Sequence, residues 1–205
     1  KMIRILLISS LIISNLILTE YTNSNGKALE KPFRDLIKWV RSDVEPKLAQ
    51  IEVSSEWQNI NLNDEDNYII WIGHSTFIIK KEGVTILTDP VFSDRASPFK
   101  SIGPERLIPA AMNINQLPKI DFVTVSHNHY DHLDINSLIE ISKLYPEAVF
   151  LVPIGDGKLL KRKRIKNVYE FNWWESYSLQ GLTLTFTPVQ HWSKRGLFDR
   201  NKSLW

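Results

Sequence analysis

After Asp66 the sequence changes to short apolar runs that are rich in β-branched residues. The runs "YIIWI" (68–72), "TFIIK" (76–80) and "VTILT" (84–88) are separated by the turn residues "GHS" and "KEG". Short β-branched runs between turn signals are typical of strands joined by tight turns. The sequence therefore predicts three neighbouring strands in a meander.

Beyond residue 120 the chain alternates between strand-like and helix-like segments. "DFVTVS" (121–126) and "AVFLVP" (148–153) predict strands, and "LDINSLIEISKLYP" between them predicts a helix that Asp134 caps and Pro146 ends. "GDGKLLKRKRI" (155–165) predicts a second helix, and strands are expected near "VYEF" (168–171) and "LTLTFTPV" (182–189). This order predicts a layered α/β or α+β domain over residues 67–205.

The first 66 residues differ in character from this domain. A short basic start precedes an apolar stretch over residues 5–18, which matches a signal-peptide core better than a spanning helix of about 20 apolar residues. We predict a signal peptide or membrane anchor at residues 1–24, although no small-x-small cleavage site follows, and a buried N-terminal helix is the alternative. Residues 25–66 contain the amphipathic stretch "FRDLIKWVRSDV" and are expected to form a helical N-terminal arm that wraps the domain. The protein is thus expected to be exported or membrane-associated.

Composition narrows the chemistry that the domain can perform. The formal net charge of +2 is too small to indicate a nucleic-acid partner, since phosphate-backbone binders carry a clear basic excess. The chain has no cysteine, so any catalytic metal must be bound by His, Asp or Glu. Neither feature predicts the oligomeric state.

The stretch "TVSHNHYDH" (124–132) holds three of the five histidines of the chain and an aspartate within six positions. It begins at the end of the predicted strand "FVTV". Side chains alternate along extended backbone, so His127 and His129 are expected to point to the same side and to converge on one ion. A turn at Tyr130 would let Asp131 and His132 reach a second ion. The alternative is a polar loop whose histidines are satisfied individually by hydrogen bonds.

The same stretch, "SHNHYDHLD", carries the HxHxDH signature and resembles the metallo-β-lactamase superfamily. The flanking strings are similar to one branch, the N-acylphosphatidylethanolamine-hydrolysing phospholipase D family, and they fall in the family's order over residues 71–205: "WIGHSTFII", "ILTDPVFSDRASPF", "GPERL", "LPKIDFVTVSHNHYDHLD", "WWE" and "QHWSKRGLFDRNKSLW". The resemblance implies an αββα sandwich with its metal site along one edge between two sheets. It covers roughly the first half of that fold, so an incomplete domain is expected.

The resemblance also implies the metal ligands. His127, His129 and His191 match the ligands of the first of two zinc ions, and Asp131 and His132 match catalytic ligands of the second. In the family, an aspartate that bridges both metals and a last histidine follow beyond the position of Trp205.

Four further residues have weaker assignments. Asp89 in "LTDP" is expected beside the metals, where it orients a ligand or a water, or else it only forms the turn before Pro90. His74 in "GHST" either contacts the metal ligands without binding the metal itself or is a structural turn histidine. Lys194 and Arg195 follow His191 and either contact a substrate phosphate or are solvated loop charges.

The implied activity is hydrolysis of N-acylphosphatidylethanolamine-type phospholipids to N-acylethanolamine and phosphatidic acid by a metal-activated hydroxide. This activity implies a phospholipid substrate and a membrane surface as partners. The long loop over residues 91–112 is expected to form a lid or an entry wall for acyl chains, or to be an ordinary packed loop. The alternatives are another hydrolase of the superfamily, such as a lactonase of a soluble phosphorylated substrate, and an inactive truncated metal-binding fragment.

Overall fold

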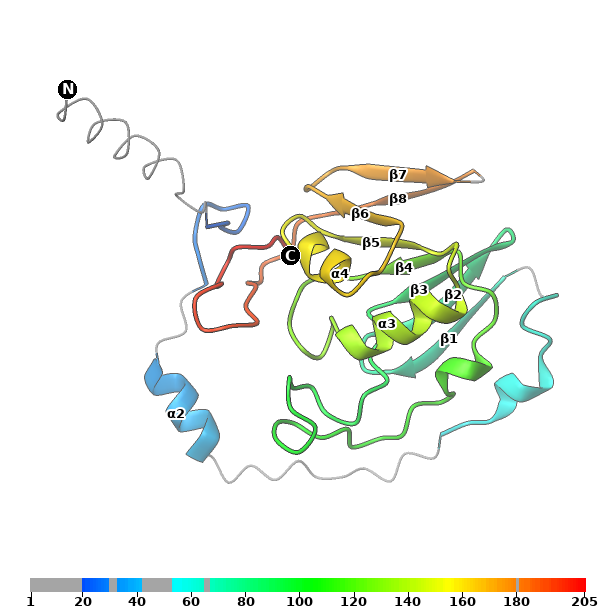
Figure 1. The fold of residues 1–205 in the computed structure, drawn as a ribbon, viewed down its shortest axis with the longest axis horizontal. Coiled ribbons are helices and arrows are strands. Elements are labelled where there is room, and N and C mark those ends of the chain that lie inside the picture. Colours follow the sequence, from blue (N-terminus) through cyan, green and yellow to red (C-terminus); the bar gives the residue numbers. More distant parts are fainter. Residues whose placement is uncertain (1–19, 30–32, 42–52, 65–66, 180) are drawn as a thin grey trace.

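A computed structural model of the protein describes residues 20–29, 33–41, 53–64, 67–179 and 181–205. In this part of the chain a six-stranded mixed sheet runs in sequence order from β1 to β6 (Figure 1). Its strands are β1 (Tyr68–Gly73), β2 (Thr76–Lys81), β3 (Val84–Thr88), β4 (Phe122–Thr124), β5 (Val149–Pro153) and β6 (Val168–Phe171). The first three are antiparallel, and β3 to β6 are parallel, which confirms the predicted meander and the strands that follow it.

Two helices connect the parallel strands and cover one face of the sheet (Figure 1). Helix α3 (Ile135–Leu144) joins β4 to β5, and its N-cap Asp134 accepts a hydrogen bond from the backbone N–H of Asn136 at 3.1 Å, as predicted. Helix α4 (Gly157–Arg162) joins β5 to β6. The main core lies between these helices and the sheet and includes Ile78, Leu87, Val123, Leu138 and Ile141.

The opposite face of the sheet is partly covered by a hairpin of two strands, β7 (Ser176–Leu179) and β8 (Leu182–Thr185). Their apolar side chains pack on a second cluster of sheet residues, and the ring of Tyr177 lies edge-on to that of Phe122, with 5.7 Å between the ring centroids. The result is a layered arrangement of helices, a mixed sheet and a second small sheet. It confirms the predicted α/β layering and contains part of the predicted sandwich.

One strand and two element boundaries differ from the prediction. Strand β7 is absent from the prediction. Its alternation of serine with tyrosine and leucine covers only four residues, which is too short a pattern to indicate a strand. The predicted strand over residues 182–189 is regular only in β8. Helix α4 is shorter than the predicted helix over residues 155–165, since Arg164 adopts a left-handed backbone with a φ of 65° that a continuing helix does not allow.

Upstream of the sheet, the structure describes helix α2 (Phe33–Arg41), the 3₁₀ helix η1 (Glu56–Asn59) and residues 20–29. Helix α2 forms where the amphipathic pattern predicts it, whereas residues 1–19 of the predicted signal peptide or anchor, and residues 30–32, 42–52 and 65–66 of the predicted arm, lie outside the described residues. The division into leader, arm and domain stays a prediction. Among the helices in the described ranges, none is long and apolar enough to cross a membrane.

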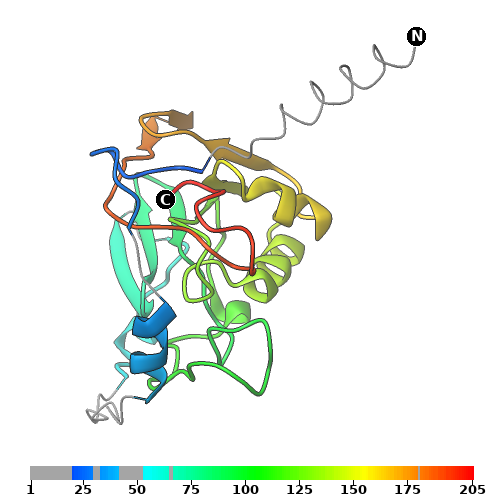
Figure 2. The same cartoon turned by 90° about the vertical axis from the view of Figure 1, so that its left-hand side faces the viewer.

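The segment of residues 20–29 lies against the C-terminal segment of the chain (Figures 1 and 2). The backbone N–H of Tyr21 donates to the carbonyl of Asn201 at 2.7 Å. Two parts of the chain that are far apart in sequence therefore meet beside the end of the sheet.

Candidate metal centre

The histidine-rich stretch begins where β4 leaves the sheet. The N–H of Val125 still donates to the carbonyl of Leu151 on β5 at 2.9 Å, and the backbone is irregular from there to α3. The chain then turns at Tyr130, because the N–H groups of His132 and Leu133 both donate to the carbonyl of His129, at 3.1 and 2.8 Å. Loops at the carboxyl ends of parallel strands are where sites in layered α/β domains are built.

The side chains alternate along this loop as the sequence predicts. His127 and His129 face each other, with 2.9 Å between His127 Nε2 and His129 Nδ1. Asn128 between them is buried elsewhere, and its Nδ2 donates to the carboxylate of Asp156 at 3.1 Å. Two imidazoles thus share one side of the loop.

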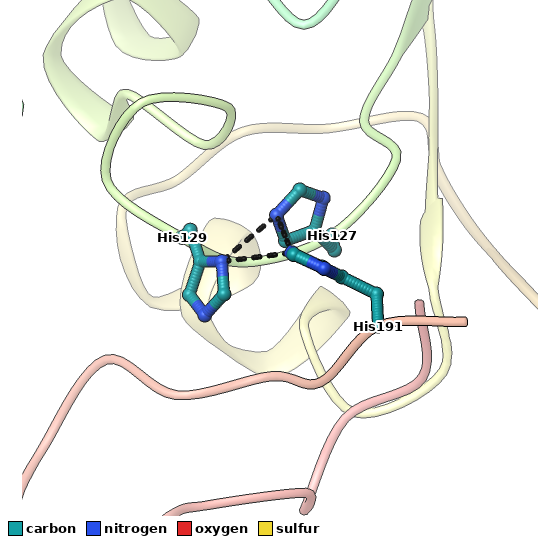
Figure 3. Close-up of side chains that lie close together, drawn as sticks. All are labelled: His127, His129 and His191. Carbon is teal, nitrogen blue, oxygen red and sulfur yellow. Dashed lines mark hydrogen bonds between the residues drawn. The ribbon is translucent and has the colours of Figure 1, made fainter. Parts of the chain in front are cut away.

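His191 completes a triangle of ring nitrogens with this pair (Figure 3). It comes from the segment after β8, and its Nε2 lies 3.0 Å from His127 Nε2 and 3.2 Å from His129 Nδ1. The three side chains form a group whose ligand atoms could hold a metal ion.

Protons alone cannot satisfy such a triangle. Each nitrogen is either a donor or an acceptor, so in any choice of tautomers at least two of the three have the same role and repel. A cation that accepts all three lone pairs removes this conflict. Tetrahedral zinc with bonds of about 2.0–2.1 Å separates its ligand nitrogens by roughly 3.3 Å, close to the distances between these nitrogens.

The hydroxyl of Ser126 fixes the tautomer of His127. A carboxylate only accepts, so Ser126 Oγ donates to Asp89 Oδ2 at 2.6 Å and must accept from His127 Nδ1–H at 2.9 Å. The lone pair of His127 then lies on Nε2, which faces the other two histidines. Burial, together with the neighbouring imidazoles, lowers the pKa of His127 to about 2, so the neutral form that binds metals is the one present.

A second group lies beside the first and consists of His74, Asp131 and His132, whose ligand atoms lie within 4.8 Å of one another. His74 Nε2 is 3.2 Å from Asp131 Oδ2, and His132 Nε2 is 3.7 Å from the same oxygen. The rings of His127 and His132 are 4.1 Å apart between centroids. The sequence predicts either a role in supporting the ligands or a structural role in a turn for His74. In the structure His74 lies next to Asp131 and His132, the two predicted ligands of the second ion.

Asp89 connects the two groups. It follows β3 in a left-handed conformation with a φ of 35° and is 6% exposed. Its Oδ2 accepts from His132 Nδ1 at 2.7 Å, which leaves the lone pair of His132 on Nε2, facing Asp131. Burial lowers the pKa of His132, but the hydrogen bond to Asp89 and the charges of Asp89 and Asp131 outweigh it, so the net pKa is raised.

A family model described as the Beta-lactamase superfamily domain matches residues 84–205, which include both halves of the site apart from His74. The chain belongs to the metallo-β-lactamase superfamily.

Two curated relatives are similar to this superfamily member over two thirds of its length. The N-acyl-phosphatidylethanolamine-hydrolyzing phospholipase D 1 of Caenorhabditis elegans is 42% identical over 147 residues, which are 67% of this chain and 41% of the relative. The mitochondrial N-acyl-phosphatidylethanolamine-hydrolyzing phospholipase D of Saccharomyces cerevisiae is 39% identical over 142 residues, which are 67% of this chain and 30% of the relative. The chain thus spans less than half the length of either relative.

Among solved structures, a novel metallo hydrolase from the hyperthermophilic archaeon Ignicoccus hospitalis aligns with a TM-score of 0.46. The alignment is 24% identical in sequence and covers 61% of this chain and 49% of the other.

The two basic residues that follow His191 in this metallo-β-lactamase domain hold the loop in place. Arg195 Nη1 donates to the carbonyls of Asn128 and Leu133 at 2.9 and 2.7 Å, and its guanidinium stacks 4.0 Å from the ring centre of Tyr130. The backbone N–H of Lys194 donates to Asn128 Oδ1 at 2.9 Å. These contacts favour a bracing role for Arg195, and a phosphate contact by either residue stays a prediction.

A cavity of about 580 Å³ opens onto both groups of the metallo-β-lactamase site. Residues of the loop over 91–112, among them Leu107 and Ile108, form part of its wall together with Trp71 and Trp192. His129 and Asp131 also line this cavity. The loop that the sequence predicts as an entry wall thus lies beside the candidate metal centre.

Sequence reasoning did not single out Ser126 or Asn128, which orient the loop. Side chains alternate along the loop, and this alternation places Asn128 on the side opposite to His127 and His129, where it is buried. Ser126 carries no comparable signal, because its partner Asp89 lies 37 residues away in the sequence.

Proposed function

We propose that this protein is a zinc-dependent phosphodiesterase that hydrolyses N-acylphosphatidylethanolamine-type phospholipids to N-acylethanolamine and phosphatidic acid. The observation that carries the proposal is the convergence of three imidazole nitrogens within 3.2 Å of one another, beside His74, Asp131 and His132. The similarity to two phospholipases of this type adds the substrate class.

The donor set suits zinc. His127, His129 and His191 would hold a first ion through neutral ring nitrogens, and Asp131 and His132 would hold a second, with His74 adjacent. When bound, two such ions act as Lewis acids and lower the pKa of a water molecule towards neutral. The chain itself fixes the tautomers that expose the ligand lone pairs, through Ser126 at His127 and Asp89 at His132.

The cavity favours a lipid over a small soluble substrate. Trp71, Leu107, Ile108 and Trp192 give it an apolar lining that suits an acyl chain, and the candidate ligands His129 and Asp131 line the same cavity. Two further apolar residues of the loop over 91–112, Phe99 and Ile102, are 62% and 65% exposed, as expected where a protein meets acyl chains. A lactonase of a soluble phosphorylated substrate is the alternative within the superfamily.

We propose that the protein works at a membrane surface, either exported or anchored. The substrate class and the apolar sequence over residues 5–18 support this location. Fractionation of a tagged full-length protein tests it, and recovery wholly in the soluble cytoplasm would contradict it.

The decisive experiment measures product release from vesicles that contain N-acylphosphatidylethanolamine, with zinc-loaded protein. The variant with His127→Ala and His129→Ala should lose both zinc and activity, whereas Lys158→Ala, at an exposed position on α4, should keep both. Turnover of a soluble phosphorylated lactone in place of the lipid would favour the alternative. A wild-type protein that retains no zinc after dialysis would overturn the proposal.

A further inference from the structure

Asn23 is a buried polar residue in a segment that is mostly exposed. It is 7% exposed, whereas Thr22 and residues 24–29 are exposed. Asn23 N–H and Nδ2 both donate to the carbonyl of Lys27, at 3.1 and 3.0 Å, and Gly26 closes the turn with its N–H on the carbonyl of Asn23 at 2.8 Å. Gly26 has a φ of 75°, which suits glycine in such a turn. The turn presents Asn23 Oδ1 to the rest of the protein.

That oxygen accepts two hydrogen bonds from the C-terminal segment. The backbone N–H of His191 donates to it at 2.9 Å, and the indole Nε1–H of Trp205 donates at 3.0 Å. Trp205 is 1% exposed, and its Nε1–H is shared with the carbonyl of Val189 at 3.0 Å. One side-chain oxygen of Asn23 therefore fastens both ends of the stretch over residues 189–205, which lies beside residues 20–29 in both views (Figures 1 and 2).

The backbone of His191 is positioned by contacts between loops. Like His127 and His129, it lies outside the helices and strands. Its neighbour Ser193 is tied to Asn201 and Ser203 within the same segment, by a backbone bond of 2.8 Å and a hydroxyl bond of 2.6 Å. Asn23 is bound directly to the main chain of His191 from outside that segment. Metal ligands are held within a narrow range of positions by the groups behind them.

We infer that Asn23 is a positioning residue for the metal ligand His191, and that the turn around it belongs to the working site. The inference rests on the proposed metal site, and it adds a residue outside residues 84–205, which the superfamily model matches. Asn23 does not touch the ion; it acts through the backbone of His191. The geometry predicts that loss of the amide loosens the third ligand while the pair His127 and His129 stays in place.

The test measures the affinity of the full chain for Zn²⁺ by competition with a chromogenic chelator. Asn23→Ala should weaken binding roughly 10- to 100-fold, as loss of a group behind a metal ligand does. Asn25→Ala is the matched control, because Asn25 belongs to the same turn, is exposed, and accepts the N–H of Lys27 within that turn, at 3.0 Å. It should stay within about twofold of the wild type. Asn23→Asp keeps an oxygen for both donors and should restore most of the affinity.

A second readout separates positioning from general destabilisation. The visible absorption of bound Co²⁺ reports the ligand geometry, and it should change in Asn23→Ala but not in Asn25→Ala, at a temperature where both variants are fully folded. If Asn23→Ala does not fold, Asn23→Ser serves in its place with the same expectation, since its shorter side chain cannot reach both donors.

Wild-type affinity in Asn23→Ala, equal losses in Asn23→Ala and Asn25→Ala, or no rescue by Asn23→Asp would overturn the inference. These results differ from failure of the proposed function. In that case the wild type itself binds no zinc, or the variant with His127→Ala and His129→Ala binds it unchanged.

Discussion

Asp89 Oδ2 accepts hydrogen bonds from both His132 Nδ1, at 2.7 Å, and Ser126 Oγ, at 2.6 Å, so that one carboxylate oxygen sets the tautomers of a histidine in each half of the site. Through Ser126 it acts on His127, and directly it acts on His132. An aspartate that belongs to neither candidate ligand group can therefore influence both of them.

Asp89→Asn should weaken the binding of both ions, and of the second more than the first. An amide offers N–H groups where the carboxylate only accepts, so the tautomers of His132 and His127 are no longer fixed. We expect a loss of about 10- to 100-fold at the second ion, measured by metal titration and calorimetry. Asp121→Asn is the control, since Asp121 lies just before β4 and binds Thr85 N–H and Lys119 instead. Equal losses in the two variants would contradict this role of Asp89.

Asp131→Asn should separate the two halves of the site. Asp131 contacts His74 and His132 and lies outside the triangle of His127, His129 and His191, so the first ion should stay bound while the second is lost, together with most phosphodiesterase activity. Metal content after dialysis gives the number of ions retained. Simultaneous loss of both ions would show that the two groups form a single site.

Asp156 predicts a dependence of stability on pH. Burial raises the pKa of this carboxyl from 3.8 to about 7, against the hydrogen bonds from Ser203 and Asn128 that lower it. A raised pKa in the folded state means that the folded protein binds the proton more tightly, so the free energy of unfolding should fall as the pH rises from about 4 to about 7. At about 1.4 kcal/mol for each tenfold change in proton affinity, the fall approaches roughly 4 kcal/mol.

Asp156→Asn should flatten this profile, because the amide keeps the acceptor for Ser203 and Asn128 but does not ionise. Urea unfolding at a series of pH values measures the change. Glu147→Gln, at an exposed carboxyl, should leave the profile of the wild type intact. An unaltered slope in Asp156→Asn would exclude Asp156 as its source.

Arg195→Lys distinguishes bracing from substrate contact. Lysine cannot reproduce two bonds from one planar group together with the stacking on Tyr130, so we expect the free energy of unfolding to fall by about 1–3 kcal/mol. Arg162→Lys, at the exposed end of α4, should change it little. An unchanged stability with a raised KM for the phospholipid would instead support a phosphate contact.

The sequence predicts those parts of the fold whose signals are local. The β-branched runs of β1 to β3 and the cap at Asp134 lie within a few residues of the structure that they determine. Strand β7 pairs with β8, and its Tyr177 packs against Phe122 on a distant strand, a contact that a window of four residues does not reveal. The same limit applies to α4, where a single left-handed residue, Arg164, ends the helix early.

In the candidate site, too, the local features are predictable from the sequence and the long-range contacts are not. The alternation of extended backbone is enough to place His127 beside His129, and the resemblance to a known family adds His191. The tautomers depend on Asp89, which reaches His132 across 43 residues of sequence, and the position of His191 depends on Asn23, which is 168 residues away. Nothing near Asn23 marks it as more than a turn residue.

The bond between Asn23 and Trp205 spans 182 residues, and it has a consequence for the order of events during synthesis. Contacts between distant residues form late, since the long intervening loop must close first. While the chain leaves the ribosome, His127 and His129 can meet early, but His191 is fastened only after the segment over residues 189–205 has emerged and met Asn23. During synthesis the histidine triangle is therefore completed later than the pair of His127 and His129, and binding of metal by all three histidines follows the return of residues 189–205 to Asn23.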